Sequence, residues 1–117
     1  MEQINKVELR GVVGNVRTSN VSGKTVYDFS LATNSAFKDR GGNAVIETQW
    51  HQVTTWDASD GTNEGLEHLD KGSKVFLTGR IQYERYLASD GIERNRTKII
   101  STRVVVLDGP DQLDYEM

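Results

Sequence analysis

The sequence predicts an all-β domain with one short helix, folded as a five-stranded Greek-key barrel of the OB-fold type. Five segments alternate apolar and polar residues, as strands with one buried face do. Gly11 and Gly14 interrupt the first segment, which is typical of a strand that bulges or bends around a barrel. The one convincing helix signal falls between the third and fourth segments, where the OB-fold has its helix. A β-sandwich is the alternative, but it would need more strands and no helix at that place.

The elements are expected in the order β-β-β-α-β-β. The strands are predicted at residues 4–18, 25–33, 45–56, 74–86 and 96–107. Their connections are predicted to be a turn at 19–24, a loop or hairpin tip at 34–44, and a hairpin connection at 87–93 that turns at Asp90-Gly91. In the remaining segment a helix is expected to begin at Thr62 or Asn63, to carry Leu66 and Leu69, and to end at Gly72.

Length and composition indicate one soluble domain. The chain has 117 residues, of which 36% are hydrophobic and 26% charged, and these values are typical of a globular protein. Residues 1–107 are expected to form the domain and residues 108–117 a short acidic tail. There is no cysteine, no signal-peptide pattern, and no apolar run near the roughly 20 residues that span a bilayer. A cytoplasmic location is therefore expected.

The net charge of −3 hides an asymmetry along the chain. All 14 Lys and Arg residues lie at or before Arg103, whereas four acidic residues crowd positions 108–117. Residues 1–107 therefore carry 14 basic and 13 acidic side chains, a net charge of +1. A local basic groove is compatible with this balance.

No enzyme activity, metal or cofactor is expected. The two histidines, His51 and His68, lie in a strand and in the expected helix, and neither has metal-ligand spacing to other candidate ligands. Lys71-Gly72-Ser73 lacks the leading glycine of a phosphate-binding loop and ends a helix instead of opening one. No acid-base pair or activated nucleophile can be assembled from the remaining residues.

Both tryptophans lie on the third predicted strand, in the stretch TQWHQVTTWD. Because side chains along a strand alternate faces, Trp50 and Trp56 share one face, and His51 points to the other. The residues between the tryptophans on that face, Gln52 and Thr54, are polar, which favours an exposed surface over core packing. At roughly 3.3 Å per residue the rings are about 20 Å apart, a spacing that suits stacking on separate bases of one nucleic-acid strand.

Phe37 and Tyr86 have a similar setting. Each is an aromatic residue at a predicted loop edge, Phe37 next to Lys38 and Arg40, and Tyr86 next to Arg85. A base can stack on such a ring while the neighbouring cation contacts a phosphate. Packing within a hairpin is an equally good explanation for either residue alone.

Several segments, taken together, resemble the DNA-binding domain of bacterial single-stranded DNA-binding proteins. They are NKVELRGVVG, DFSLATN, ETQWHQVTTW and LDKGSKVFLTGRI, followed by the closing strand, and they cover about residues 4–107 in the same order. The resemblance implies a homotetrameric OB-fold protein that coats single-stranded DNA without strong sequence preference, in replication, recombination and repair, at the nucleoid. It also implies that the first strand supplies much of the dimer interface, with His51 near subunit contacts.

The resemblance assigns eight residues to DNA binding. Its stacking aromatics correspond to Phe37, Trp50, Trp56 and Tyr86, and its phosphate-contacting cations to Lys6, Arg40, Lys71 and Arg85. Two departures stand out. The acidic stretch DGPDQLDYEM has neither the long linker nor a close copy of the tip through which family members recruit other proteins. Glu84 and Asp57 place negative charge beside the expected groove, which would weaken binding or raise its salt sensitivity.

Two other binding functions remain open from the residues alone. Stacking aromatics on the same barrel would also serve RNA or an oligosaccharide. An OB-type adaptor, such as a primosome-like accessory protein, would use the barrel mainly to hold protein partners.

Overall fold

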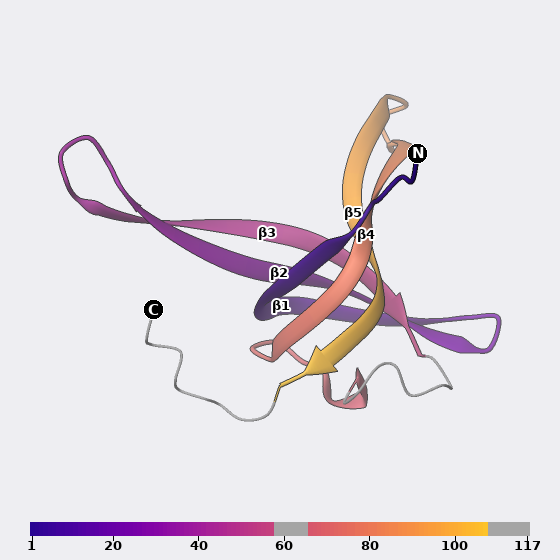
Figure 1. Cartoon of the computed structure of the whole chain (residues 1–117). Helices are drawn as coiled ribbons and strands as arrows, with labels where there is room; N and C mark the ends of the chain where they lie inside the picture. The colour runs from indigo at the N-terminus through magenta and orange to yellow at the C-terminus, as the bar shows by residue number, and fades with distance from the viewer. Residues whose placement is uncertain (58–65, 108–117) are drawn as a thin grey trace.

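The computed structural model describes residues 1–57 and 66–107, and these residues form a closed β-barrel (Figure 1). Its strands are β1 (Val7–Val21), β2 (Lys24–Lys38), β3 (Ala44–Trp56), β4 (Lys74–Leu87) and β5 (Glu93–Val106). Around the barrel they follow the order β1-β2-β3-β5-β4, and β4 closes it by pairing antiparallel with β1. The junction of β3 with β5 is parallel. The predicted OB-fold barrel is therefore confirmed.

The expected helix is reduced, among the described residues, to one 3₁₀ turn, η1 (Leu66–His68). Leu66 and Leu69 are both buried, so their spacing correctly identified an apolar face. Gly72 has a φ of 90°, which fits its predicted role at the end of this segment. The predicted helix start at Thr62 or Asn63 and the predicted acidic tail at 108–117 lie outside the described residues.

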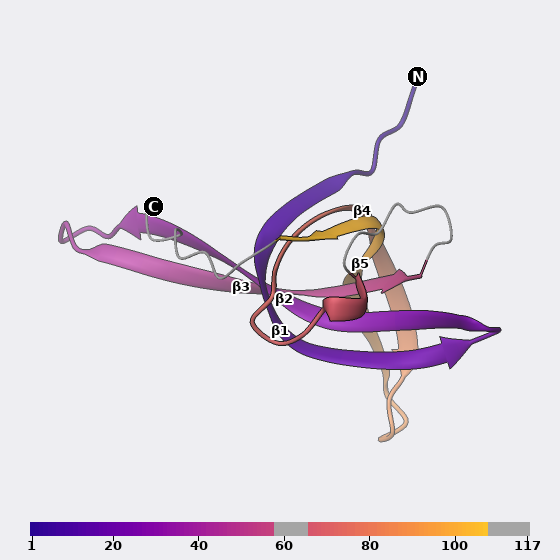
Figure 2. The same ribbon diagram turned by 90° about the horizontal axis from the view of Figure 1, so that it is seen from below.

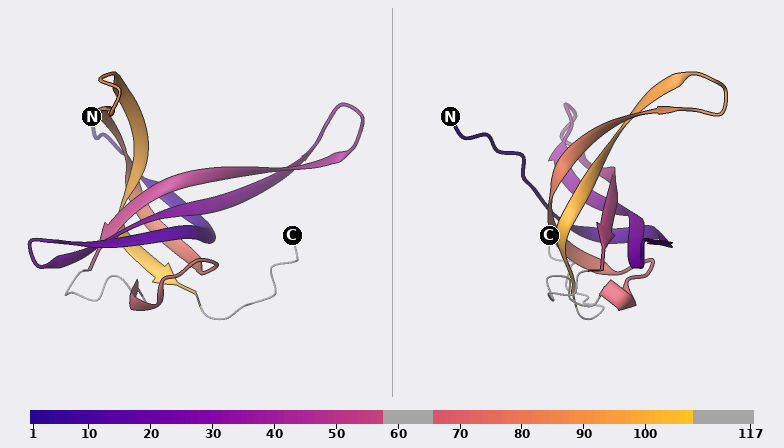
Figure 3. Two further views of the ribbon diagram at one scale, coloured as in Figure 1. Left: turned by 180° about the vertical axis from the view of Figure 1, so that it is seen from behind. Right: turned by 90° about the vertical axis from the view of Figure 1, so that its right-hand side faces the viewer.

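Three hairpins extend the strands beyond the barrel (Figures 1 and 2). The β1–β2 turn contains only Ser22 and Gly23, whose φ angles of 52° and 82° are both positive, as a type I′ turn requires. The β2–β3 arm projects to the opposite side, and the β4–β5 hairpin rises away from both (Figure 3). The turn predicted at 19–24 is thus reduced to residues 22 and 23, and the loop or hairpin tip predicted at 34–44 is reduced to a tip at 39–43. Both faces of a projecting two-stranded arm meet water, so polar composition there does not mark a loop.

Glycines permit the close crossing of β1 over the barrel. The register between β1 and β2 shifts between Val13 and Val16, which confirms the bulge predicted near Gly14. A Cβ atom on Gly11 would overlap the backbone carbonyl of Ala32. Only glycine allows these two strands to approach as they do.

The core lies inside the barrel and is built from the inward-facing residues of every strand. Its most buried members include Phe29 and Leu31 of β2, Val53 of β3, and Leu77 of β4. Polar groups on the inner face are satisfied, because the hydroxyl of Thr55 donates to the carbonyl of Ser101. No described helix is long and apolar enough to cross a membrane.

Candidate nucleic-acid interface

The outer face of β3 carries both tryptophans, as the alternation of the sequence predicted. Val53 and Thr55 point into the core, whereas Trp50 has 59% of its surface exposed and Trp56 is half-buried. His51 belongs to the inner row, and its Nε2 hydrogen-bonds with the hydroxyl of Thr33 at 2.9 Å. The strand therefore separates two aromatic rings on the outside from a histidine on the inside.

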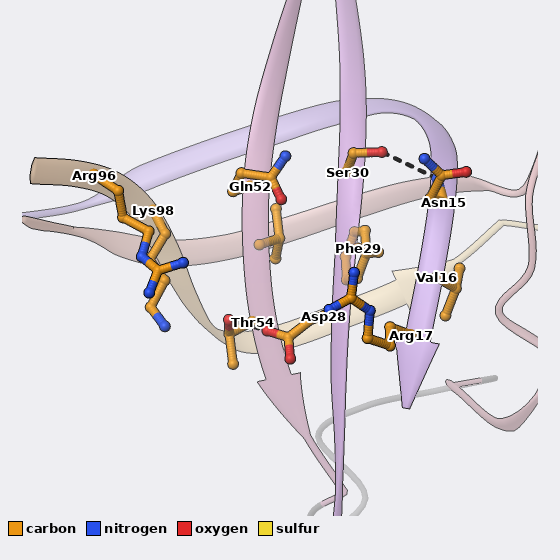
Figure 4. Close-up of a pocket in the computed structure, with 11 residues that line it drawn as sticks. Asn15, Val16, Arg17, Asp28, Phe29, Ser30, Gln52, Thr54, Arg96 and Lys98 are labelled. Carbon is orange, nitrogen blue, oxygen red and sulfur yellow. Dashed lines mark hydrogen bonds between the residues drawn. The ribbon is translucent and has the colours of Figure 1, made fainter. Parts of the chain in front are cut away.

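A polar groove of about 540 Å³ crosses the outer face of the barrel between the two tryptophans. Gln52 and Thr54 of β3 and Asp28 and Ser30 of β2 lie along it. In Figure 4, Arg96 and Lys98 of β5 stand at one side of the groove, and Asn15, Val16 and Arg17 of β1 stand at the other. Thr54 donates a hydrogen bond to Asp28, and Ser30 accepts one from the backbone of Asn15 at 3.0 Å, so the floor is internally ordered.

Each tryptophan lies at one end of this groove. The Trp50 ring covers Gly14, next to the groove residue Asn15, so closely that a Cβ on Gly14 would stand 2.7 Å from the ring. Trp56 pairs with Val26 across β2 and β3 and lines a shallow apolar hollow with Val21 near the β1–β2 turn. Two flat apolar rings therefore bracket a polar, cation-bearing surface.

The closeness of Gly14 and Trp50 makes a testable prediction. Gly14→Ala is expected to displace both the Ser30 hydroxyl and the indole ring of Trp50, because the added Cβ would stand 2.6 Å from Ser30 Oγ and 2.7 Å from the ring. The tryptophan emission spectrum should shift, and the midpoint of thermal unfolding, measured by circular dichroism, should fall, because the Ser30 hydroxyl also accepts a hydrogen bond from the backbone of Asn15. An unchanged emission spectrum in the folded variant would show that Trp50 does not rest on Gly14.

The four predicted cations lie around the barrel, and none of them lines the groove. Lys6 precedes β1 and pairs with Glu8 at 3.7 Å, and Arg40 lies in the β2–β3 turn. Next to Lys71, Gly72 donates its backbone N–H to Val13, which adjoins the glycine under Trp50. Arg85 is an exposed residue of β4.

Tyr86 lies within β4, and the cation that contacts its ring is Arg96 of β5, not the neighbouring Arg85 that the sequence suggested. Arg85 alternates to the opposite face of β4, because adjacent residues of a strand point in opposite directions. The guanidinium of Arg96, on β5, lies over the Tyr86 ring at 4.6 Å from its centroid. Tyr86 is 38% exposed, so the cation covers part of the ring that was predicted to stack with a base.

Phe37 lies near the end of β2, in the β2–β3 arm, and is 48% exposed. The register between β2 and β3 is regular along the arm, and it places Phe37 opposite Val45 and Ala32 opposite Trp50. By strand alternation, Phe37 therefore belongs to the row of Leu31, not to the row opposite Trp50. The four aromatics do not form one row, and only the tryptophans share a face of the β2–β3 ribbon.

Glu84 of β4 holds two of the groove cations. Its two carboxylate oxygens contact Arg96 at 3.3 Å and Lys98 at 3.2 Å, and one of them accepts a hydrogen bond from Gln82 at 2.8 Å. The hydrogen bonds from Gln82 and Lys98, followed by the charges of Lys98 and Arg96, lower the pKa of Glu84 below its usual range. Glu84 is therefore an anion throughout the neutral pH range.

The sequence interpretation missed Arg17, Arg96 and Lys98, the cations that line the groove. A signal was present for two of them. Arg94, Arg96 and Lys98 recur at every second position of one strand, and this spacing places all three on one face. Arg17 gave no such signal, because the bulge near Gly14 shifts the face on which it lies.

No metal-binding group of three or more histidine or acidic side chains occurs in residues 1–57 and 66–107. The interface instead has a closed five-stranded barrel, two aromatic rings and a polar groove lined by three cations. The closed barrel defines the class of the protein, an OB-fold protein. The chain belongs to the single-strand binding protein family, whose profile matches residues 4–107.

Relatives support this membership. The chain is 38% identical over 108 residues to a single-stranded DNA-binding protein of Xanthomonas axonopodis pv. citri, and the match covers 91% of this chain and 59% of the relative. It is 35% identical over 113 residues to the protein of that name in Neisseria meningitidis serogroup A, with coverages of 93% and 63%. The chain thus spans about three-fifths of the length of these curated relatives.

The fold also matches a solved structure. A Plasmodium falciparum SSB, solved as a complex with ssDNA, superposes with a TM-score of 0.78 at 26% identity, and the match covers 92% of this chain and 98% of that one.

Proposed function

We propose that this protein binds single-stranded DNA without strong sequence preference. The observation that carries the proposal is the placement of Trp50 and Trp56 at the two ends of one polar groove. Bases would stack on the two rings, and the groove cations would contact the intervening phosphates. Stacking needs only the flat face of a base, so this arrangement binds any sequence.

Family membership extends the proposal to biological role and assembly. The named relatives are single-stranded DNA-binding proteins, and one structural neighbour holds ssDNA. We therefore assign this chain to coating single strands in replication, recombination and repair at the nucleoid, as a homotetramer without catalytic activity. Phe37, Tyr86, Lys6, Arg40, Lys71 and Arg85 are proposed as further DNA contacts outside the groove. Light scattering of the purified chain tests the assembly.

The decisive experiment is a titration with oligo-dT followed by tryptophan fluorescence. Quenching is expected at low salt, since both indole rings stack in the bound state, and it should weaken as salt rises. Competition with single-stranded RNA and with duplex DNA tests the ligand class. The absence of quenching at low salt would contradict the proposal, and a preference for RNA would favour the RNA-binding alternative.

A further inference from the structure

We propose that Arg96 and Lys98 form a phosphate-binding site that the carboxylate of Glu84 occupies in the unbound protein, so that Glu84 competes with DNA for these cations. The inference rests on the proposed function, because it names a contact and a regulating residue within the same interface. Neither the sequence interpretation nor the resemblance assigned Arg96 or Lys98 to DNA binding.

Arg96 and Lys98 lie together in the groove between the two tryptophans. Arg96 and Lys98 are two residues apart on β5, so they project from the same face, and both line the groove between the tryptophans. The parallel pairing of Val53 with Ile99 places Lys98 level with Gln52. A nucleic-acid strand that runs between Trp50 and Trp56 therefore passes these cations.

Both cations are paired with the carboxylate of Glu84. Glu84 spans both of them, with one carboxylate oxygen 3.3 Å from Arg96 Nε and the other 3.2 Å from Lys98 Nζ. A phosphate group offers the same pair of anionic oxygens that guanidinium and ammonium groups bind. Because Gln82 also hydrogen-bonds to the carboxylate, Glu84 is held in place as a fixed competitor.

The cation nearest the aromatic ring is held on two sides. The Nε of Arg96 contacts the carboxylate of Glu84, and the guanidinium carbon of Arg96 lies 4.6 Å from the centroid of the Tyr86 ring. The ring and the carboxylate together orient this side chain before any ligand arrives. A phosphate that replaces Glu84 would meet an arginine already facing the groove.

The net charge of this cluster determines how Glu84 is expected to affect DNA affinity and its salt dependence. The cluster of Arg96, Lys98 and Glu84 carries a net charge of +1, and removal of the carboxylate charge raises it to +2. On a single strand, each additional neutralised phosphate steepens the dependence of log K on log salt concentration by about 0.7. Glu84 therefore weakens binding and also makes the salt dependence shallower, which reverses the salt effect expected from the sequence.

The test compares Glu84→Gln with a matched control, Glu93→Gln, by oligo-dT titrations over a range of salt concentrations. Glu93 is an exposed acid on β5, and it alternates to the face opposite Arg96 and Lys98. Glu84→Gln is expected to bind roughly five-fold more tightly at about 50 mM salt, with a slope steeper by about 0.7. Glu93→Gln is expected to retain the wild-type slope.

A triple variant shows whether the gain comes from the two cations. In Glu84→Gln/Arg96→Gln/Lys98→Gln the gain in affinity and slope should disappear, with folding checked by thermal unfolding. Equal changes in the Glu84 and Glu93 variants, or a gain that survives in the triple variant, would overturn the competition by Glu84 for Arg96 and Lys98 while leaving binding of single-stranded DNA intact. A wild-type protein that fails to bind oligo-dT would overturn the proposed function itself.

Discussion

Trp50→Ala and Trp56→Ala are each expected to weaken binding of oligo-dT by roughly 5- to 150-fold. The reason is that one base stacked on an aromatic side chain contributes about 1–3 kcal/mol, and each substitution removes one ring. Trp50 should show the larger loss of the two, because its ring is 59% exposed, whereas Trp56 is half-buried against Val21 and Val26. Both affinities are measured by competition against a labelled oligo-dT, since each variant loses part of the fluorescence signal.

Tyr83→Ala is the matched control for these variants. Tyr83 is 76% exposed on β4, but it alternates to the face opposite Tyr86 and the groove cations. Its removal deletes an exposed aromatic ring on the face of β4 that carries Arg85, outside the groove, and should cost clearly less affinity than either tryptophan variant. If the folded tryptophan variants also bound like wild type, the barrel would not use these rings for DNA, and the adaptor hypothesis would be favoured.

Alternation along strands accounts for most of what the sequence predicted correctly. It placed Trp50 and Trp56 on one face of the third strand and His51 on the other, and the structure has them so. These predictions succeed because a one-residue shift in register would move an entire apolar row into water. The same constraint is weak in the projecting hairpins, where both faces are solvated, so the loop or hairpin tip predicted at 34–44 is confirmed only at 39–43, and residues 34–38 are strand.

The predicted cations show why proximity in sequence is a poor guide to a site on a sheet. Arg85 was paired with Tyr86 because the two are adjacent, yet adjacent residues of a strand face opposite ways. The cation that reaches the ring, Arg96, comes from the neighbouring strand, and its position depends on the register between β4 and β5. That register is set by the turn type and length of the β4–β5 connection, which the sequence pattern located but did not fix residue by residue.

Phe29→Ala is expected to have the largest effect on stability, a loss of about 3–5 kcal/mol in the free energy of unfolding. Phe29 is only 2% exposed and lies opposite Val16 of β1 and Val53 of β3. Its ring fills the barrel directly beneath the groove, so truncation leaves a cavity that the closed sheet cannot readily collapse. Urea unfolding followed by circular dichroism, at a fixed protein concentration, measures the loss.

Phe37→Ala removes the same atoms from the same strand and is therefore the informative comparison. Phe37 is 48% exposed in the β2–β3 arm, so its removal should change the free energy of unfolding by no more than about 0.5–1 kcal/mol. If Phe37 stacks with a base, Phe37→Ala should lose DNA affinity and keep its stability. Phe29→Ala should show the reverse: it should lose stability but keep its DNA affinity at temperatures where it is folded. A loss of stability at Phe37 equal to that at Phe29 would show that the arm is buried in the assembled protein, and that packing, not stacking, explains this aromatic residue.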